Sequence, residues 1–137
     1  MPKEGEREKD MIKEIVIIVV VVALVIGLDV ISNNYLKESV TELSNELNIL
    51  RGLILEENKE KAQEQMQKVK DKWRERYNVL AYYIEHDELE KVETELVKLS
   101  ADIDMEEYKH CINELNTSIF ILEHIGQKEK LDIISVF

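Results

Sequence analysis

The apolar and polar positions of this 137-residue chain follow two contrasting patterns. From Ile15 to Leu28 no side chain is polar, whereas from Leu36 onward apolar residues recur every three or four positions. An uninterrupted apolar run is typical of a membrane helix, and a spacing of three and four is typical of amphipathic helices. The pattern therefore predicts a membrane anchor followed by a helical domain.

The apolar run crosses a bilayer only when its flanks are included. Residues 15–28 would extend about 21 Å at roughly 1.5 Å per residue, whereas residues 12–31 would match a hydrocarbon core of about 30 Å. A cleaved signal peptide and a soluble core helix are the alternatives, and a buried strand is disfavoured by the length of the run. We expect a transmembrane anchor at residues 12–31, preceded by a cytoplasmic tail at residues 1–11.

The distribution of basic residues predicts the orientation of this anchor. Four basic residues lie before the anchor or at its N-terminal end: Lys3, Arg7, Lys9 and Lys13. Only Lys37 follows it closely. Because an excess of Lys and Arg marks the cytoplasmic side, we expect a single-pass protein with a cytoplasmic N-terminus and an extracytoplasmic domain at residues 32–137.

Four apolar stripes follow the anchor, each with the spacing of one helix face. The first two comprise Leu36, Val40, Leu43, Leu47, Leu50 and Ile54, then Ala62, Met66, Val69, Trp73, Tyr77, Leu80 and Ile84. The other two comprise Leu89, Val92, Leu96, Leu99 and Ile103, then Met105, Tyr108, Ile112, Leu115, Ile119 and Leu122. The first stripe fits a core-facing helix or a short coiled-coil seam, and the change of phase after it predicts a turn within residues 56–61. We therefore expect an all-α fold, an N-terminal transmembrane helix followed by an antiparallel bundle of about four helices.

Composition agrees with helices and restricts the partners. Charged residues make up 34% of the chain, with four Gly and one Pro, which is unfavourable for turn-rich β-folds. The net charge of −11 disfavours a nucleic-acid partner, because binding phosphate requires positive charge. The single cysteine, Cys111, excludes an intramolecular disulfide.

The spacing of acidic residues predicts where two helices begin. Asp87 with Glu90, and Asp104 with Glu107, have the spacing of capping boxes. We therefore expect the third helix to start at Asp87 and the fourth at Asp104.

The C-terminal segment is expected to cover an apolar surface. Gly126 is predicted to end the fourth helix, and Phe120 and Ile121 lie off its apolar stripe. The apolar tail at residues 131–137 is then expected to fold back over these two side chains or to bind a partner.

Three groups of residues contain side chains of the types that bind metals or act as nucleophiles. Glu107 and His110 form one carboxylate–histidine pair, too few for the di-metal site of a helical bundle. The acids of residues 102–106 lack the glycine and the final glutamate of a calcium loop, which leaves only weak calcium binding as an alternative. His110 and Cys111 are neighbours whose side chains diverge on a helix. We predict no catalytic residue, cofactor site or metal site.

The remaining candidate residues are aromatic or lie at a junction. They are Trp73, Tyr83, His86, Phe120, Ile121 and Phe137. Trp73 is interpreted as a core anchor and His86 as part of the turn between the second and third helices. Residues 85–107 carry ten acids against two lysines, which indicates either a solvated surface or a surface for a basic partner.

Several of these features resemble the bacterial family called domain of unknown function 4363. They are Trp73 in a charged helix, the junction from Tyr83 to Leu89, the start of the last helix at Asp104, and the apolar end at Phe137. The chain ends in Ser-Val-Phe where the family is expected to end in Asn-Ile-Phe. The resemblance implies a membrane segment followed by helices, and it implies no activity.

These patterns favour a membrane-tethered interaction or assembly module without catalytic activity. We expect residues 12–31 to lie in the lipid bilayer. We expect the helical domain to bind a protein partner or a second copy of the chain. The alternative is an extracytoplasmic domain that binds or senses a small ligand near Trp73 and the junction at residues 82–86. An exposed apolar patch on a packed core would favour the first function, and a roomy cavity with polar groups the second.

Overall fold

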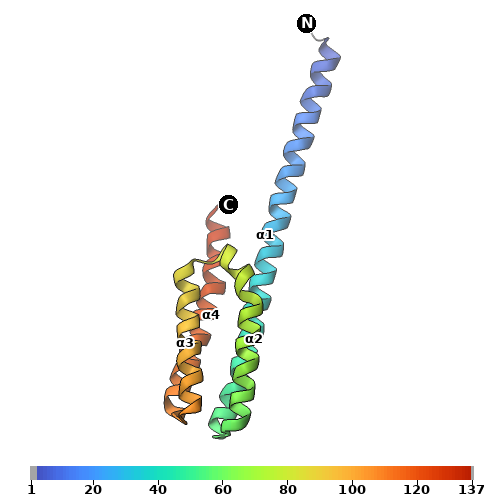
Figure 1. Cartoon of the computed structure of the whole chain (residues 1–137). Helices are drawn as coiled ribbons and strands as arrows, with labels where there is room; N and C mark the ends of the chain where they lie inside the picture. Colours follow the sequence, from blue (N-terminus) through green and yellow to red (C-terminus); the bar gives the residue numbers. More distant parts are fainter. Residues whose placement is uncertain (1–2, 137) are drawn as a thin grey trace. The chain divides into compact units, whose positions relative to one another are not determined.

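The computed structural model describes residues 3–136, with side chains described as far as Gln127. Four helices occupy these residues: α1 (Glu4–Leu55), α2 (Lys59–Tyr83), α3 (His86–Asp104) and α4 (Tyr108–Val136) (Figure 1). The described part of the chain contains no strand. By its internal contacts the chain divides into residues 1–34 and residues 35–137, and α1 contributes to both units. The predicted all-α class is confirmed.

The first unit contains the N-terminal part of α1, whose apolar side chains have no protein cover. The large apolar side chains between Ile15 and Ile31 are 45–65% exposed. Among the described residues, α1 is the one helix that is long and apolar enough to cross a membrane, by length and composition. Residues 4–11, predicted as a tail, also belong to this helix.

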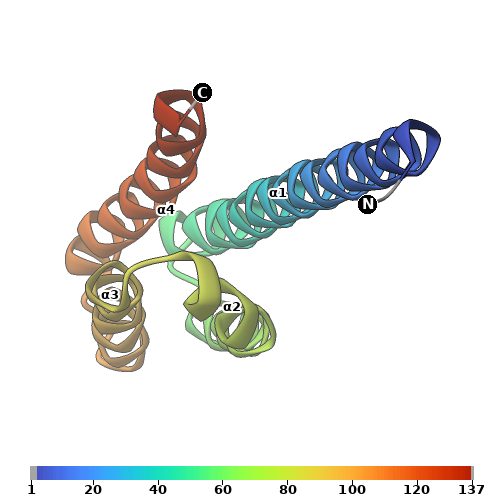
Figure 2. The same cartoon turned by 90° about the horizontal axis from the view of Figure 1, so that it is seen from above.

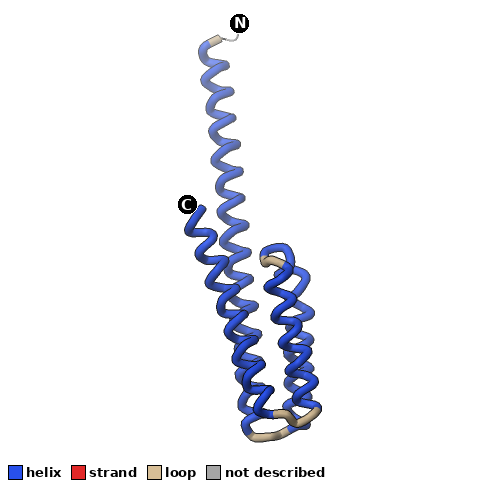
Figure 3. The backbone as a smooth tube through the Cα atoms, turned by 90° about the vertical axis from the view of Figure 1, so that its left-hand side faces the viewer, coloured by secondary structure: helices blue, strands red, loops and turns tan. Residues whose placement is uncertain are grey.

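The second unit is a bundle in which successive helices run in opposite directions. The α1–α2 and α3–α4 turns lie at one end and the α2–α3 turn at the other (Figure 3). Seen along the bundle, α3 lies beside α2 (Figure 2). At the end with two turns, the Tyr108 hydroxyl donates to the Glu57 carbonyl at 3.3 Å and joins them.

The core of the bundle follows the first three predicted stripes. Every member of these stripes is buried except Val40 and Tyr77, which are half-buried against the core. The prediction for α4 is partly wrong. Among the α4 residues with described side chains, those from Tyr108 to Gln127, the buried ones are Cys111, Leu115, Ser118, Leu122 and Ile125.

The inward face of α4 includes small residues that the spacing of large apolar residues does not predict. Cys111 and Ser118 are fully buried, whereas Met105, predicted to point inward, is 70% exposed in the turn before the helix. Ser118 can be buried because its hydroxyl donates to the Glu114 carbonyl at 2.8 Å, which satisfies its hydrogen-bonding capacity.

The turns after α1 and α3 share one backbone conformation. Glu57 and Glu106 have φ angles of 55° and 58°, in the left-handed region that favours glycine. In each turn the following N–H donates to a carbonyl five residues back, at 3.1 and 2.9 Å, which is the Schellman arrangement. The predicted turn within residues 56–61 is confirmed, and Asn58 then caps α2 by accepting a hydrogen bond from the Lys61 N–H at 3.2 Å.

Two predicted helix starts are wrong. Helix α3 begins at His86 with Glu85 in the N-cap position, so Asp87 lies inside the helix. Asp104 is the last residue of α3, and α4 begins four residues later. The Asp104 carboxylate instead accepts a hydrogen bond from the Gln63 amide of α2 at 2.8 Å. Two acids three positions apart fit both a helix N-cap and an exposed helix face. Contacts from another helix decide which of these two places the residues take.

The predicted helix stop at Gly126 is also wrong. Helix α4 continues through this residue to Val136, and the glycine has no positive φ. A Cβ at Gly126 would make only ordinary contacts with Val40, at 3.9 Å. Because α4 is uninterrupted, the segment after Gly126 does not turn back over Phe120. The side chains of residues 128–137, and therefore the predicted site residue Phe137, lie outside those described.

Candidate functional site

The predicted site residues lie on three different helices. Trp73 is buried at 6% exposure, Tyr83 is 47% exposed, His86 is exposed, Phe120 is 69% exposed and Ile121 is half-buried. The Phe120 ring stacks on His124 with centroids 6.3 Å apart. Of these residues, Trp73 lines a cavity of the bundle, and Ile121 borders a separate hollow beside α3.

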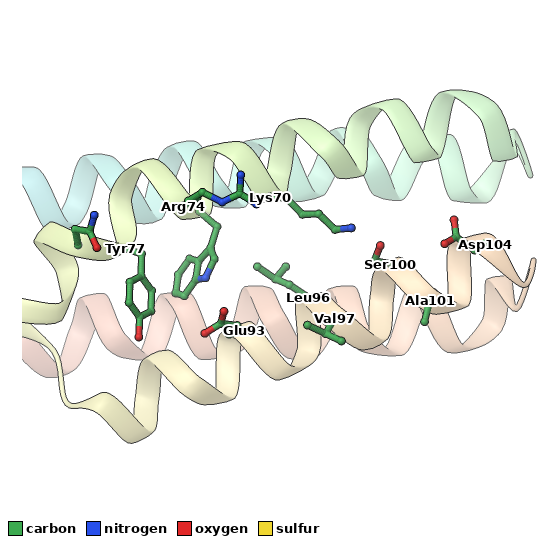
Figure 4. A pocket seen from close by; sticks show the side chains of 11 residues that line it. Lys70, Arg74, Tyr77, Glu93, Leu96, Val97, Ser100, Ala101 and Asp104 are labelled. Atoms are coloured by element: carbon green, nitrogen blue, oxygen red, sulfur yellow. The ribbon is translucent and has the colours of Figure 1, made fainter.

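This cavity lies between α2 and α3 and has a volume of about 520 Å³. Its α2 side includes Lys70, Trp73, Arg74 and Tyr77, and its α3 side includes Glu93, Leu96, Val97, Ser100 and Asp104 (Figure 4). Pockets that hold small ligands are commonly about 300–1,000 Å³. None of residues 82–86 lines it, so the cavity is centred near Trp73 and away from the α2–α3 junction.

One wall of the cavity is aromatic. Trp73 and Tyr77 meet edge to face, with ring centroids 5.8 Å apart and an angle of 68° between the rings. Such pairs contribute stability beyond the area they bury. The Trp73 indole N–H is buried and has no acceptor among the described residues. A buried donor without an acceptor is unusual in a protein core.

Two pairs of basic residues on α2 have different neighbours, and the first pair contacts α1. Arg76 donates to the Glu42 carboxylate of α1 at 2.6 Å and lies over the Tyr35 ring at 4.9 Å. Lys72 lies 3.6 Å from the same carboxylate. The hydrogen bond from Arg76 is the main reason that the pKa of Glu42 is lowered. These two basic side chains therefore join α2 to α1.

Lys70 and Arg74 line the α2–α3 cavity instead. Among the described residues, neither takes part in an ion pair. Neither Lys70 nor Arg74 was predicted as a site residue, because spacing along the chain does not show which basic residues of α2 meet Glu42. Val97 on the facing helix also lines the cavity and was not predicted as a site residue.

Two titratable groups between α3 and α4 have raised pKa values. Burial, with hydrogen bonding to Asp102, raises the pKa of Glu114 to about 7. Burial, with the nearby charges of Asp102 and Glu114, raises the pKa of the Cys111 thiol to about 11. His110 is exposed while Cys111 is buried, so the predicted divergence of these neighbours is confirmed. No group of three or more His, Cys, Asp or Glu suited to a metal ion occurs in the described part of the chain.

Comparison with known families identifies the larger part of the chain. A family model described as a domain of unknown function (DUF4363) matches residues 30–136. The match covers the last part of α1 and all of α2 and α3, together with α4 to its end. No curated protein and no solved structure matches the chain.

Proposed function

The chain belongs to the DUF4363 family, whose function is unknown, and we propose that it is a membrane-tethered helical module that acts by association with another protein. The observation that carries this proposal is the uncovered apolar surface of residues 12–31. The large apolar side chains of this span are at least 45% exposed, an extent that soluble proteins rarely present to water.

A lipid bilayer supplies the cover that the protein lacks. Each buried square ångström of apolar surface contributes about 25 cal/mol, and a single helix satisfies its own backbone hydrogen bonds in lipid. The charged residues within the span, Lys13, Glu14 and Asp29, stand near its ends, where they can reach the headgroups. The basic residues before the span favour a cytoplasmic N-terminus.

The bundle supports a role in association rather than catalysis. Its one thiol, Cys111, is buried and protonated, which is unsuited to nucleophilic attack. On α4, the exposed Phe120 ring and its stacked neighbour His124 form an aromatic surface of the kind that is enriched at protein interfaces. A second copy of the chain is one partner that this surface could bind.

Cysteine accessibility tests the tether. In a Cys111→Ala background, single cysteines replace Lys3 and the exposed Lys109. A membrane-impermeant maleimide should label position 109 in intact cells and position 3 only after lysis. The reverse labelling would contradict the orientation. A mature chain that lacks the apolar span would contradict the tether.

Photo-cross-linking tests association. A benzophenone amino acid at Phe120 should give a discrete cross-linked band in cells, and the same amino acid at the exposed Lys68 of α2 serves as the matched control. A band at twice the mass of the chain would identify self-association, and any other discrete band a different partner. Equal, diffuse products from both positions would contradict a specific surface on α4.

A further inference from the structure

We propose that the α2–α3 cavity binds one small molecule with an apolar aromatic body and a single anionic group. This role goes beyond tethering and association and depends on neither. The observations that carry it are the size of the cavity, its aromatic wall, and the two basic side chains on its α2 side that have no ion-pair partner among the described residues.

The cavity has room for such a body and surfaces that fit it. Its volume of about 520 Å³ is within the range of ordinary ligand pockets. Trp73 and Tyr77 supply aromatic surface from α2, and Leu96 supplies aliphatic surface from α3. Val97, which also lines the cavity, is 63% exposed. A bound ring would therefore remove apolar surface from water on both helices.

The charge of the ligand follows from Lys70 and Arg74. These residues are four positions apart on α2, so they lie on the same side of the helix. The Lys70 side chain extends into the space between α2 and α3 (Figure 4). The other basic residues of this stretch, Lys72 and Arg76, are occupied by Glu42. A carboxylate or sulfonate would form charge-assisted hydrogen bonds with the pair.

The acids of α3 restrict the ligand to one negative charge. Glu93 and Asp104 line the opposite side of the cavity (Figure 4), so a second anionic group directed toward α3 would be repelled. Asp104 already accepts a hydrogen bond from Gln63. The buried Trp73 N–H lacks an acceptor among the described residues, and a ligand could supply one. The cavity is thus complementary to a monoanion whose charge lies on the α2 side.

Two probes that differ in charge test this inference. The full chain is placed in phosphatidylcholine nanodiscs and titrated by calorimetry with 2-naphthalenesulfonate or with neutral 2-naphthalenemethanol, and heats from empty nanodiscs are subtracted. We expect one saturable sulfonate site per chain. The double substitution K70Q/R74Q should weaken sulfonate binding about tenfold or more, as expected for the loss of charge-assisted hydrogen bonds. Binding of the alcohol should be unchanged by this substitution.

The matched control changes net charge equally without touching the cavity. K61Q/K68Q removes two exposed basic residues of α2, and sulfonate affinity should stay close to that of the unmodified chain. Ala101 lines the cavity and is exposed, so Ala101→Phe should fill the space and remove binding of both probes while the helix content is retained. The inference is overturned if the sulfonate has no saturable site, if both double variants bind it equally, or if Ala101→Phe leaves binding intact.

Discussion

Replacement of Trp73 measures how much this side chain contributes to the unfolding free energy of the bundle. Truncation of a buried tryptophan to alanine commonly costs about 3–5 kcal/mol of unfolding free energy. Two features of the site place the expected value at the lower end. Trp73 borders a cavity that opens to solvent, so water can enter the vacated space. Its indole N–H has no acceptor among the described residues, so no hydrogen bond is lost. We expect Trp73→Ala to cost about 3 kcal/mol.

Two further variants show whether the loss of stability comes from the lost packing of the Trp73 ring or from substitution on α2 in general. Trp73→Phe keeps an aromatic ring against Tyr77 and removes the unpaired donor, so its cost should be only about 1 kcal/mol. Val79→Ala, at a position of the same helix that is exposed to solvent, serves as the control and should change stability by less than about 0.5 kcal/mol.

Chemical unfolding of the full chain in nanodiscs, followed by far-UV circular dichroism, measures these differences. Fluorescence is unsuitable because Trp73 is the only tryptophan. For a unit of this size, a loss of about 3 kcal/mol should also lower the melting temperature by roughly 10 °C or more. A Trp73→Ala variant within about 1 kcal/mol of the unmodified chain, or a Phe variant as unstable as the Ala variant, would refute the reasoning.

Glycine at Glu57 or Glu106 should raise the unfolding free energy by about 1 kcal/mol each, because glycine adopts a positive φ without strain. Denaturant melts of each single variant would show this, and an unchanged or lower midpoint would contradict it. Because the pKa of Glu114 is raised to about 7, its stabilising contribution is complete below its ordinary pKa and is lost as the pH rises through 7. Unfolding free energy should therefore fall by about 1–3 kcal/mol between pH 5 and pH 8. Glu114→Gln should make this dependence shallower, and an unaltered pH profile would contradict the assignment.

Local sequence patterns determined the helical class and most of the core. Three apolar stripes became buried faces, and the change of phase before Ala62 became a turn. The apolar span of α1 was equally evident, because length and hydropathy are properties of consecutive residues. Periodicity suffices for such features because one side of a helix is set by residues three and four positions apart.

Tertiary contacts decided the helix ends, the α4 core and the cavity. Asp104 hydrogen-bonds to Gln63 from another helix, and Gly126 stays helical at a position where an added Cβ would make ordinary contact with Val40. Cys111 is buried on α4 although it lies outside the predicted stripe. Among similar basic residues on α2, proximity to Glu42 separates those that join two helices from those that line the cavity. Spacing along one helix does not contain this information, because burial, capping and ion pairing depend on side chains that other helices bring into contact.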